Sequence, residues 1–274
     1  MFHTAIVRPP SASFARGLTR GHLGPPDLER ALAQHRDYVR ALEHGGVRVI
    51  ALEPDDDHPD STFVEDAAVL LPGSAVLTHP GAPSRRGEVA GIRRALEPLV
   101  PRLRTVETPG TLDGGDICQV GSHYLIGLSE RTNDEGARQL ETHLADEGCT
   151  SERIVLGQHP ELLHLKSGLA WLGGRKSGLA SLGDRRMMAT RELIGHPALR
   201  HFEVVEVDEE ERAGANGIRL GEAMLIPSGC PLLEARLRSL GLAAIALEMS
   251  EFQKMDGGIS CLSLRLGEGG SEPT

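Results

Sequence analysis

The segment ICQVGSHYLIGLSERTNDEGARQLETHLADEGCTSERIVL, residues 117–156, contains the pattern that decides the predicted fold. Two apolar runs, Ile117–Val120 and Tyr124–Gly127, lie on either side of a Gly121-Ser122 turn, which is typical of a β-hairpin. A helical stretch from about Thr132 to Glu147 follows, and Ile154–Leu156 returns as a strand. The predicted unit is therefore a hairpin, a helix and a further strand.

The same order of elements recurs along the chain. Residues 67–106 repeat it, because two apolar runs joined by Pro72-Gly73-Ser74 precede a helical stretch and a strand. A less regular copy lies within residues 187–240. The elements predicted in these copies are Ala67–Leu71, Ala75–Thr78, about Arg85–Leu99, Leu103–Val106, Met187–Ala189, Ala223–Ile226 and Leu232–Leu240.

The N-terminal part begins with a β-like run at His3–Arg8. A helix at Asp27–His44 follows, with apolar residues at helical spacing between Pro25-Pro26 and Gly45-Gly46, and Val47–Leu52 then reads as a strand.

A repeat of roughly 50 residues favours blades around a centre, because one such unit cannot bury its own apolar face. The alternative is a doubly wound sheet, since strands that alternate with helices also fit it. The first β–α turns lack a GxGxxG motif and there is no P-loop, which argues against that alternative. We expect a single domain at 1–266, followed by a disordered tail at 267–274 (GEGGSEPT).

A short duplication lies between the second and third of these copies. Lys166–Gly173 reads KSGLAWLG and Lys176–Gly183 reads KSGLASLG. Its small size predicts a local insertion, such as an extended hairpin, rather than a second domain. It follows directly after His164, which we expect to lie in a strand, so a shift of that strand would misplace this histidine.

Composition excludes several classes of partner. The formal net charge is −10 and aromatic residues make up 3% of the chain, so neither nucleic acid nor an anionic membrane is expected to bind. No run approaches the ~18 apolar residues of a membrane helix, and no secretory signal is visible. The four cysteines are scattered and lack zinc spacing. These features predict a reduced, cytoplasmic protein without a structural metal.

Two segments with the same frame contain candidate cysteines. Asp113-Gly-Gly precedes Cys118, and Asp256-Gly-Gly precedes Cys261, in both cases with the cysteine five residues after the aspartate. Cys118 lies in an apolar run and is interpreted as a core residue of a strand. Cys261, with small neighbours at the predicted start of the strand Leu262–Leu266, is a candidate nucleophile, although an inert buried thiol fits the local sequence as well.

Partners for a nucleophilic cysteine come from elsewhere in the chain. His164 is a polar residue inside the apolar run LLHLK, where it is either a core histidine or a proton carrier. Asp60, Glu65 and Asp66 precede an apolar strand. A solvated strand end would explain these carboxylates, but they also suit a guanidinium group, whose donors form a fixed fork.

Six motifs together are more specific than any one of these residues. They are Phe63–Asp66 (FVED), Pro80–Arg86 (PGAPSRR), Thr111–Asp116 (TLDGGD), Ser129–Asn133 (SERTN), Leu163–Ser167 (LHLKS) and Lys254–Cys261 (KMDGGISC). In this order, and over nearly the whole chain, the sequence resembles the dimethylarginine dimethylaminohydrolases of the guanidino-modifying superfamily. The resemblance implies a five-bladed α/β propeller of ββαβ units with the active site in its central channel.

The same resemblance implies roles for individual residues. Cys261 attacks the guanidinium carbon, His164 is the general acid and base, and Asp113 orients His164, although some members carry Glu at that position. The implied substrate contacts are Asp66 and Glu65 to the guanidinium, Asp60 and the backbone of Leu18 to the α-amino group, Arg85 and Arg131 to the α-carboxylate, and the backbone of Met255.

The implied reaction converts a methylated free arginine to citrulline and an amine through a covalent thiouronium, without a metal or cofactor. An arginine deiminase or an amidinotransferase would use the same cysteine, histidine and carboxylate. A non-catalytic protein that binds arginine derivatives is the alternative from another class. The order Asp113, His164, Cys261 and the missing papain motif argue against a papain-like protease. A homodimer is compatible with the sequence.

Overall fold

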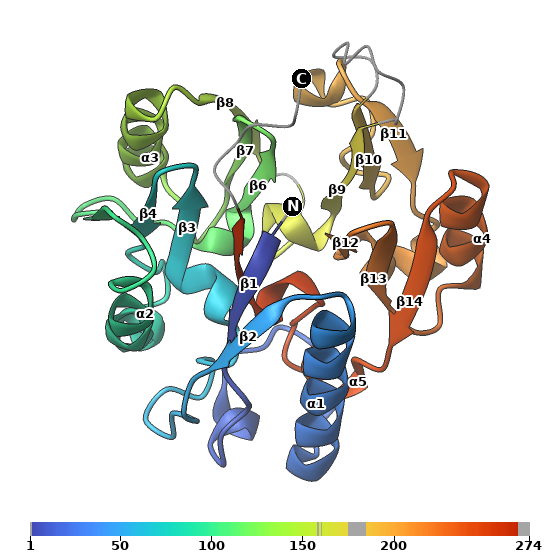
Figure 1. The fold of residues 1–274 in the computed structure, drawn as a ribbon, viewed down its shortest axis with the longest axis horizontal. Helices are drawn as coiled ribbons and strands as arrows, with labels where there is room; N and C mark the ends of the chain where they lie inside the picture. Colours follow the sequence, from blue (N-terminus) through green and yellow to red (C-terminus); the bar gives the residue numbers. More distant parts are fainter. Residues whose placement is uncertain (1, 158, 160, 175–184, 268–274) are drawn as a thin grey trace.

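Five three-stranded sheets surround a common centre in the computed structural model, which describes residues 2–157, 159, 161–174 and 185–267 (Figure 1). In each sheet the middle strand pairs antiparallel with one neighbour and parallel with the other. The predicted α/β propeller is therefore confirmed. A doubly wound sheet is wrong for this chain, because every sheet in the described ranges holds only three strands.

The predicted strands are present with their ends shifted by at most four residues, and four further strands, Leu169–Gly174, Glu203–Glu206, Ile218–Leu220 and Ala243–Leu247, were not predicted. In the sheets of the first half they are β1 (Phe2–Val7), β2 (Arg48–Ala51), β3 (Ala68–Leu71), β4 (Ser74–Leu77), β5 (Leu103–Thr105), β6 (Ile117–Val120), β7 (His123–Leu128) and β8 (Thr150–Val155). In the second half they are β9 (Leu169–Gly174), β10 (Arg185–Ala189), β11 (Glu203–Glu206), β12 (Ile218–Leu220), β13 (Ala223–Pro227), β14 (Ala243–Leu247) and β15 (Leu264–Gly267).

The ring is closed by the two ends of the described chain. β1 pairs antiparallel with β15 and parallel with β2, so one sheet joins residues 2–7 to residues 264–267. Next to this closure, the rings of Phe14, Phe63 and Phe252 pack with centroids 5.6–6.3 Å apart. Because each ring is at most 5% exposed, its burial contributes on the order of 1.5–3 kcal/mol to folding.

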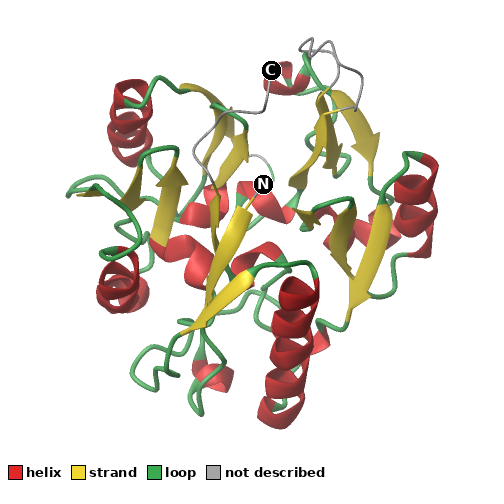
Figure 2. Cartoon of the chain, in the orientation of Figure 1, coloured by secondary structure: helices red, strands yellow, loops and turns green. Residues whose placement is uncertain are grey.

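Four longer helices lie at the outer rim of the ring (Figures 1 and 2). They are α1 (Leu28–His44), α2 (Val89–Leu96), α3 (Asp134–Asp146) and α4 (Pro231–Ser239), and a shorter helix α5 spans Ser250–Gln253. Asp27 caps α1 by accepting from the Arg30 amide, and Asn133 caps α3 by accepting from the Gly136 amide. The sheet of β9–β11 departs from the pattern, since a single 3₁₀ turn, Pro197–Leu199, stands between β10 and β11.

A 3₁₀ turn precedes the antiparallel edge strand of each sheet and lies toward the centre of the ring. The five turns are η2 (Val64–Ala67), η4 (Gly114–Asp116), η5 (Leu165–Ser167), η8 (Glu209–Ala215) and η9 (Ser260–Leu262). Neighbouring turns contact each other in the series η9, η2, η4, η5, η8. Figure 2 shows these short red segments gathered inside the ring of yellow strands. They bring residues from distant parts of the sequence together.

Two predicted positions are wrong at this level. Cys261 does not begin a strand but lies in η9, and β15 begins only at Leu264. His164 does not lie in a strand either, because it is the N-cap residue of η5. In both cases long-range hydrogen bonds hold the chain in a turn that the apolar pattern of the sequence does not reveal.

The remaining predictions concern the duplication and the tail. The first copy, Lys166–Gly173, spans parts of η5 and β9, while the second copy, Lys176–Gly183, lies outside the described residues. Of the predicted tail, Gly267 is the last residue of β15, and residues 268–274 lie outside the description. No helix in the described ranges is long and apolar enough to span a bilayer.

Candidate active site

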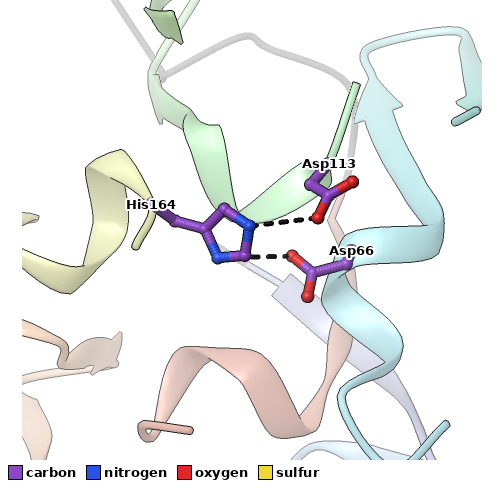
Figure 3. A group of neighbouring side chains, drawn as sticks. All are labelled: Asp66, Asp113 and His164. Carbon is purple, nitrogen blue, oxygen red and sulfur yellow. Dashed lines mark hydrogen bonds and ion pairs between the residues drawn. The ribbon is translucent and has the colours of Figure 1, made fainter. Parts of the chain in front are cut away.

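His164 lies between two carboxylates in the centre of the ring (Figure 3). Its Nε2 is 3.1 Å from Oδ2 of Asp113, and its Nδ1 is 4.0 Å from Oδ1 of Asp66. The imidazole is 6% exposed and Asp113 is fully buried. Asp66 lies in η2, and Asp113 and His164 directly precede η4 and η5. The contacts between these turns therefore bring together three residues that are up to 98 positions apart in sequence.

Asp113 is fixed by the protein on its other side as well. Its Oδ1 accepts from the Gly81 amide at 2.9 Å, and its own amide donates to the hydroxyl of Thr132 at 3.2 Å. With one oxygen held by Gly81, the other has a fixed direction toward Nε2 of His164. The contact predicted between Asp113 and His164 is thus present in the structure.

The two carboxylates favour the charged form of His164. Burial favours the neutral imidazole, but the charge of Asp66 and the hydrogen bond to Asp113 outweigh it and raise the pKa of His164 to about 9. Burial would likewise favour a neutral Asp66, yet His164 and Arg85 lower the pKa of Asp66 to about 2. At neutral pH the centre therefore holds an imidazolium beside two carboxylates.

Cys261 lies half-buried in η9, which packs against the turn that contains Asp66. The Gly258 amide points at its Sγ from 3.5 Å. Burial, together with the charges of Glu65 and Asp66, raises the pKa of this thiol to about 12. A cation that neutralised the nearby carboxylates would favour the thiolate, which is the reactive form.

Glu65 differs sharply from its neighbour Asp66. Its Oε1 contacts Lys166 at 2.6 Å and also Arg265, and its Oε2 accepts from the Ser260 hydroxyl at 2.7 Å. Although burial opposes it, Lys166 and Arg265 lower the pKa of Glu65. The carboxylate is thus paired within the protein, and its predicted contact with a guanidinium stays a prediction.

The residues predicted for the amino-acid end of a substrate lie beside this centre. Asp60 accepts from the Leu18 amide at 3.0 and 3.2 Å, so the structure brings these two together. Burial raises the pKa of Asp60, opposed by Arg85, the Leu18 amide and Arg131. Met255 is 4% exposed, and its side chain adjoins Gly17 together with Asp60.

Arg85 and Arg131 have different surroundings. Arg85 is 5% exposed and donates to Asp66, to Glu88 and to the carbonyls of Asp60 and Phe63. Nη1 of Arg131 is buried and has no hydrogen-bond partner within the described part of the chain. An unpaired buried guanidinium nitrogen is costly unless a ligand accepts its hydrogen bond. Of the two arginines, Arg131 is therefore the one with a free donor.

Asp116 is a buried residue of this centre to which the sequence analysis assigned no role. Its Oδ1 accepts from the Leu165 amide at 3.0 Å, and its Oδ2 accepts from the hydroxyls of Ser129 and Thr132 at 2.6 and 2.7 Å. Burial raises the pKa of Asp116 to about 6. It connects the turn after His164 to the loop that contains Arg131. The second aspartate of the DGGD motif was the available signal.

Asp66, Asp113 and His164 could also hold a metal ion, since ligand atoms of all three lie within 4.8 Å of one another. However, Asp113 already accepts from His164 and Gly81, and Asp66 from Gly115 and Arg85. A cation here would displace the imidazolium that these carboxylates stabilise, so the residues fit an acid–base group better than a metal centre.

Gly115 must remain without a side chain at this centre. A Cβ on Gly115 would lie 2.7 Å from both Nδ1 of His164 and Oδ1 of Asp66. We expect Gly115→Ala to lower kcat by about 10²-fold, because a shift of roughly 1 Å in a catalytic group has that effect. Gly157→Ala is the control, since its Cβ would meet nothing within 4 Å. Equal kcat values for both variants would contradict this assignment.

Comparison with known proteins identifies relatives over almost the whole chain. No protein-family profile matches it. An N(G),N(G)-dimethylarginine dimethylaminohydrolase of Pseudomonas aeruginosa is 40% identical over 266 residues, which are 97% of this chain and 100% of that protein.

Two solved structures are similar over the same extent. A variant of the P. aeruginosa enzyme complexed with citrulline superposes with a TM-score of 0.90 at 39% identity, covering 97% of this chain and 100% of the other. A histidine-to-glycine variant of a dimethylarginine dimethylaminohydrolase, in an adduct with S-methyl-L-thiocitrulline, superposes with a TM-score of 0.89, also at 39% identity and with the same coverage.

Proposed function

Since the chain belongs to the N(G),N(G)-dimethylarginine dimethylaminohydrolase family, we propose that it hydrolyses N-omega,N-omega-dimethyl-L-arginine to L-citrulline and dimethylamine. Monomethyl-L-arginine would give citrulline and methylamine. The observation that carries the proposal is the position of the His164 imidazole between Asp113 and Asp66, where η2, the turn that contains Asp66, contacts η9, the turn that contains Cys261. A cationic guanidinium, a thiol and a proton donor are the groups that this reaction requires.

In the first half of the reaction the substrate cation binds against Asp66 and favours the thiolate of Cys261. The sulfur attacks the guanidinium carbon, and a C–S bond forms. His164 donates its proton to the dimethylamino nitrogen, the C–N bond breaks, and dimethylamine leaves. The product of this half is a cationic S-alkylthiouronium on Cys261 and a neutral His164.

In the second half His164 acts as the base. It takes a proton from water while the water oxygen attacks the thiouronium carbon. The C–S bond then breaks, the thiolate of Cys261 is restored, and loss of a proton gives the urea group of citrulline. Every proton passes through His164 or solvent, so the proposed reaction needs no metal or cofactor.

The free amino acid end would be bound by the neighbouring groups. Asp60 and the backbone of Leu18 would receive the α-amino group, which is supported by the hydrogen bond between these two residues and by the nearby side chain of Met255. Arg131 would donate to the α-carboxylate through its unpaired Nη1. Arg85 donates to Asp66 instead.

Arg131→Leu should therefore reduce kcat/KM by roughly 10- to 150-fold, the worth of one hydrogen bond to a charged group. Most of this should appear as a higher KM, because the carboxylate is remote from the reacting carbon. Arg138→Leu is a matched control, since Arg138 is exposed on α3 and pairs only with Glu135 among the residues described. An unchanged KM in Arg131→Leu would remove Arg131 from the site.

Product analysis tests the function itself. The purified chain is incubated with asymmetric dimethylarginine and, separately, with arginine. Citrulline with dimethylamine from the first and little product from the second would support the proposal. Citrulline with ammonia from arginine would make the chain a deiminase with the same residues. Neither product, from folded protein with a free Cys261, would favour a non-catalytic binding protein.

We further propose a cytoplasmic location and a single catalytic domain at 1–266. A reducing compartment suits an enzyme with a nucleophilic thiol, and all four cysteines are unpaired. We also propose that the chain forms a homodimer, which a measurement of its molar mass in solution would test.

A further inference from the structure

Four of the five central turns provide residues of the proposed reaction. η2 contains Asp66, η4 follows Asp113, η5 follows His164, and η9 contains Cys261. The fifth turn, η8, ends at Asn216, which is its C-cap residue and 7% exposed. Asn216 therefore lies at the end of a turn that contacts η5, the turn that follows His164.

Asn216 joins the segments on both sides of it through its side-chain amide. Its Oδ1 accepts from the Ser260 amide at 2.8 Å, directly before Cys261. Its Nδ2 donates to the Lys166 carbonyl at 2.8 Å, two residues after His164, and to the Ser260 hydroxyl at 3.2 Å. One side chain therefore links the turn of the cysteine to the turn of the histidine.

Glu65 links the same two turns a second time. Its carboxylate accepts from the Ser260 hydroxyl and pairs with the ammonium of Lys166. Arg265 pairs with Glu65 and also donates to the Ser260 carbonyl at 2.7 Å. The amide, hydroxyl and carbonyl of Ser260 are all bonded, so the peptide before Cys261 cannot rotate without breaking buried hydrogen bonds.

We propose that Asn216 is a positioning residue that, together with Glu65, sets the separation and orientation of Cys261 and His164. The sulfur must reach the guanidinium carbon while the imidazole reaches the leaving nitrogen, and both conditions depend on how the two turns are held. An amide suits this place because it accepts on one side and donates on the other, which a carboxylate cannot do. The inference rests on the proposed function.

Two substitutions disturb the link in different ways. Asn216→Asp keeps an acceptor for the Ser260 amide but has no donor for the Lys166 carbonyl. Gly258→Ala leaves Asn216 intact, but its new Cβ would lie 2.4 Å from the Asn216 Oδ1 and displace the amide. We expect both variants to lower kcat by about 30- to 100-fold with KM changed less than about threefold.

A matched control separates positioning from general stability. Gln139 on α3 makes a similar two-sided bridge at the rim, accepting from the Glu107 amide at 2.8 Å and donating to the Glu107 carbonyl at 2.9 Å. Gln139→Leu should lower the melting temperature without changing kcat. If Asn216→Asp and Gly258→Ala lose no more kcat than Gln139→Leu, or if KM rises as much as kcat falls, the proposal is overturned.

A second measurement does not depend on turnover. The rate at which iodoacetamide alkylates Cys261 is followed against pH by mass spectrometry, in the wild-type chain and the three variants. We expect the profile to shift for Asn216→Asp and Gly258→Ala and to stay unchanged for Gln139→Leu. If the wild-type chain turns over no substrate, the proposed function fails, and unchanged alkylation profiles would then overturn the positioning role as well.

Discussion

Cys261→Ser should reduce kcat by about 10⁴-fold or more, because removal of a catalytic nucleophile from an assembled site has effects of this size. A serine hydroxyl is a much weaker acid than a thiol. The nearby base, His164, is protonated at neutral pH because Asp66 and Asp113 raise its pKa to about 9. The variant therefore has no group that could activate the hydroxyl.

The measurement combines steady-state turnover with rapid acid quench and mass spectrometry. The wild-type chain should show a covalent adduct on the peptide that contains Cys261, and the variant should show none. Cys118→Ala is the matched control, since Cys118 also stands five residues after an aspartate but is buried in β6 at 4% exposure. Turnover retained by Cys261→Ser, or lost in Cys118→Ala, would disprove the assignment.

The elements that the sequence predicts well are those with local signals. The Gly121-Ser122 turn separates β6 from β7, and Asp27 marks the first residue before α1. β14 (Ala243–Leu247) was not predicted, because its sequence AAIAL is a short run that is apolar throughout, and such a run does not distinguish a strand from a buried helical segment. The 3₁₀ turns were missed for a different reason, since partners far away in sequence hold them in place.

The candidate site shows the same limit. Cys261, His164 and Asp113 were each ambiguous alone, and only their order together with the other motifs made them specific. Asn216 gave no signal, because an asparagine after a short acidic and alanine-rich stretch is typical of an ordinary loop. Its role follows from contacts that span 44 and 50 residues.

Glu65 and Asp66 show why neighbours of the same charge are hard to separate from sequence. In a 3₁₀ turn successive residues point about 120° apart, because there are about 3.0 residues per turn. Asp66 therefore faces His164 and Arg85, while Glu65 faces Lys166, Arg265 and Ser260. The sequence shows two adjacent carboxylates, and the turn gives them different partners.

Asp113→Asn should reduce kcat by roughly 10³- to 10⁴-fold, although it changes only one atom of a buried side chain. The Asn carbonyl would keep the hydrogen bond from the Gly81 amide, so the NH₂ group would face Nε2 of His164. Since two donors cannot face each other, Nε2 must then be unprotonated. This arrangement favours the neutral imidazole, so at neutral pH the amine that departs has no acid to protonate it.

The pH dependence follows from the same contact. The charged form of His164 is present below its pKa of about 9 and is lost as the pH rises through that value. Without the Asp113 carboxylate this pKa falls, so the alkaline limb of the kcat profile should move to lower pH. The raised pKa of His164 also stabilises the folded state at low pH, and this stabilisation is lost as the pH rises through that pKa. In Asp113→Asn the loss should therefore occur at a lower pH than in the wild-type chain.

Steady-state rates and melting temperatures between about pH 5 and about pH 10 would measure both effects. Asp113→Glu is the informative partner variant, since its carboxylate retains an acceptor for Nε2 and should keep the alkaline limb even if a changed reach lowers kcat. A wild-type profile in Asp113→Asn would show that Asp66 alone holds the proton on His164. In that case Asp66, on the other side of the imidazole, would determine the pKa of His164. Asp113 would serve only to accept the hydrogen bond from Gly81.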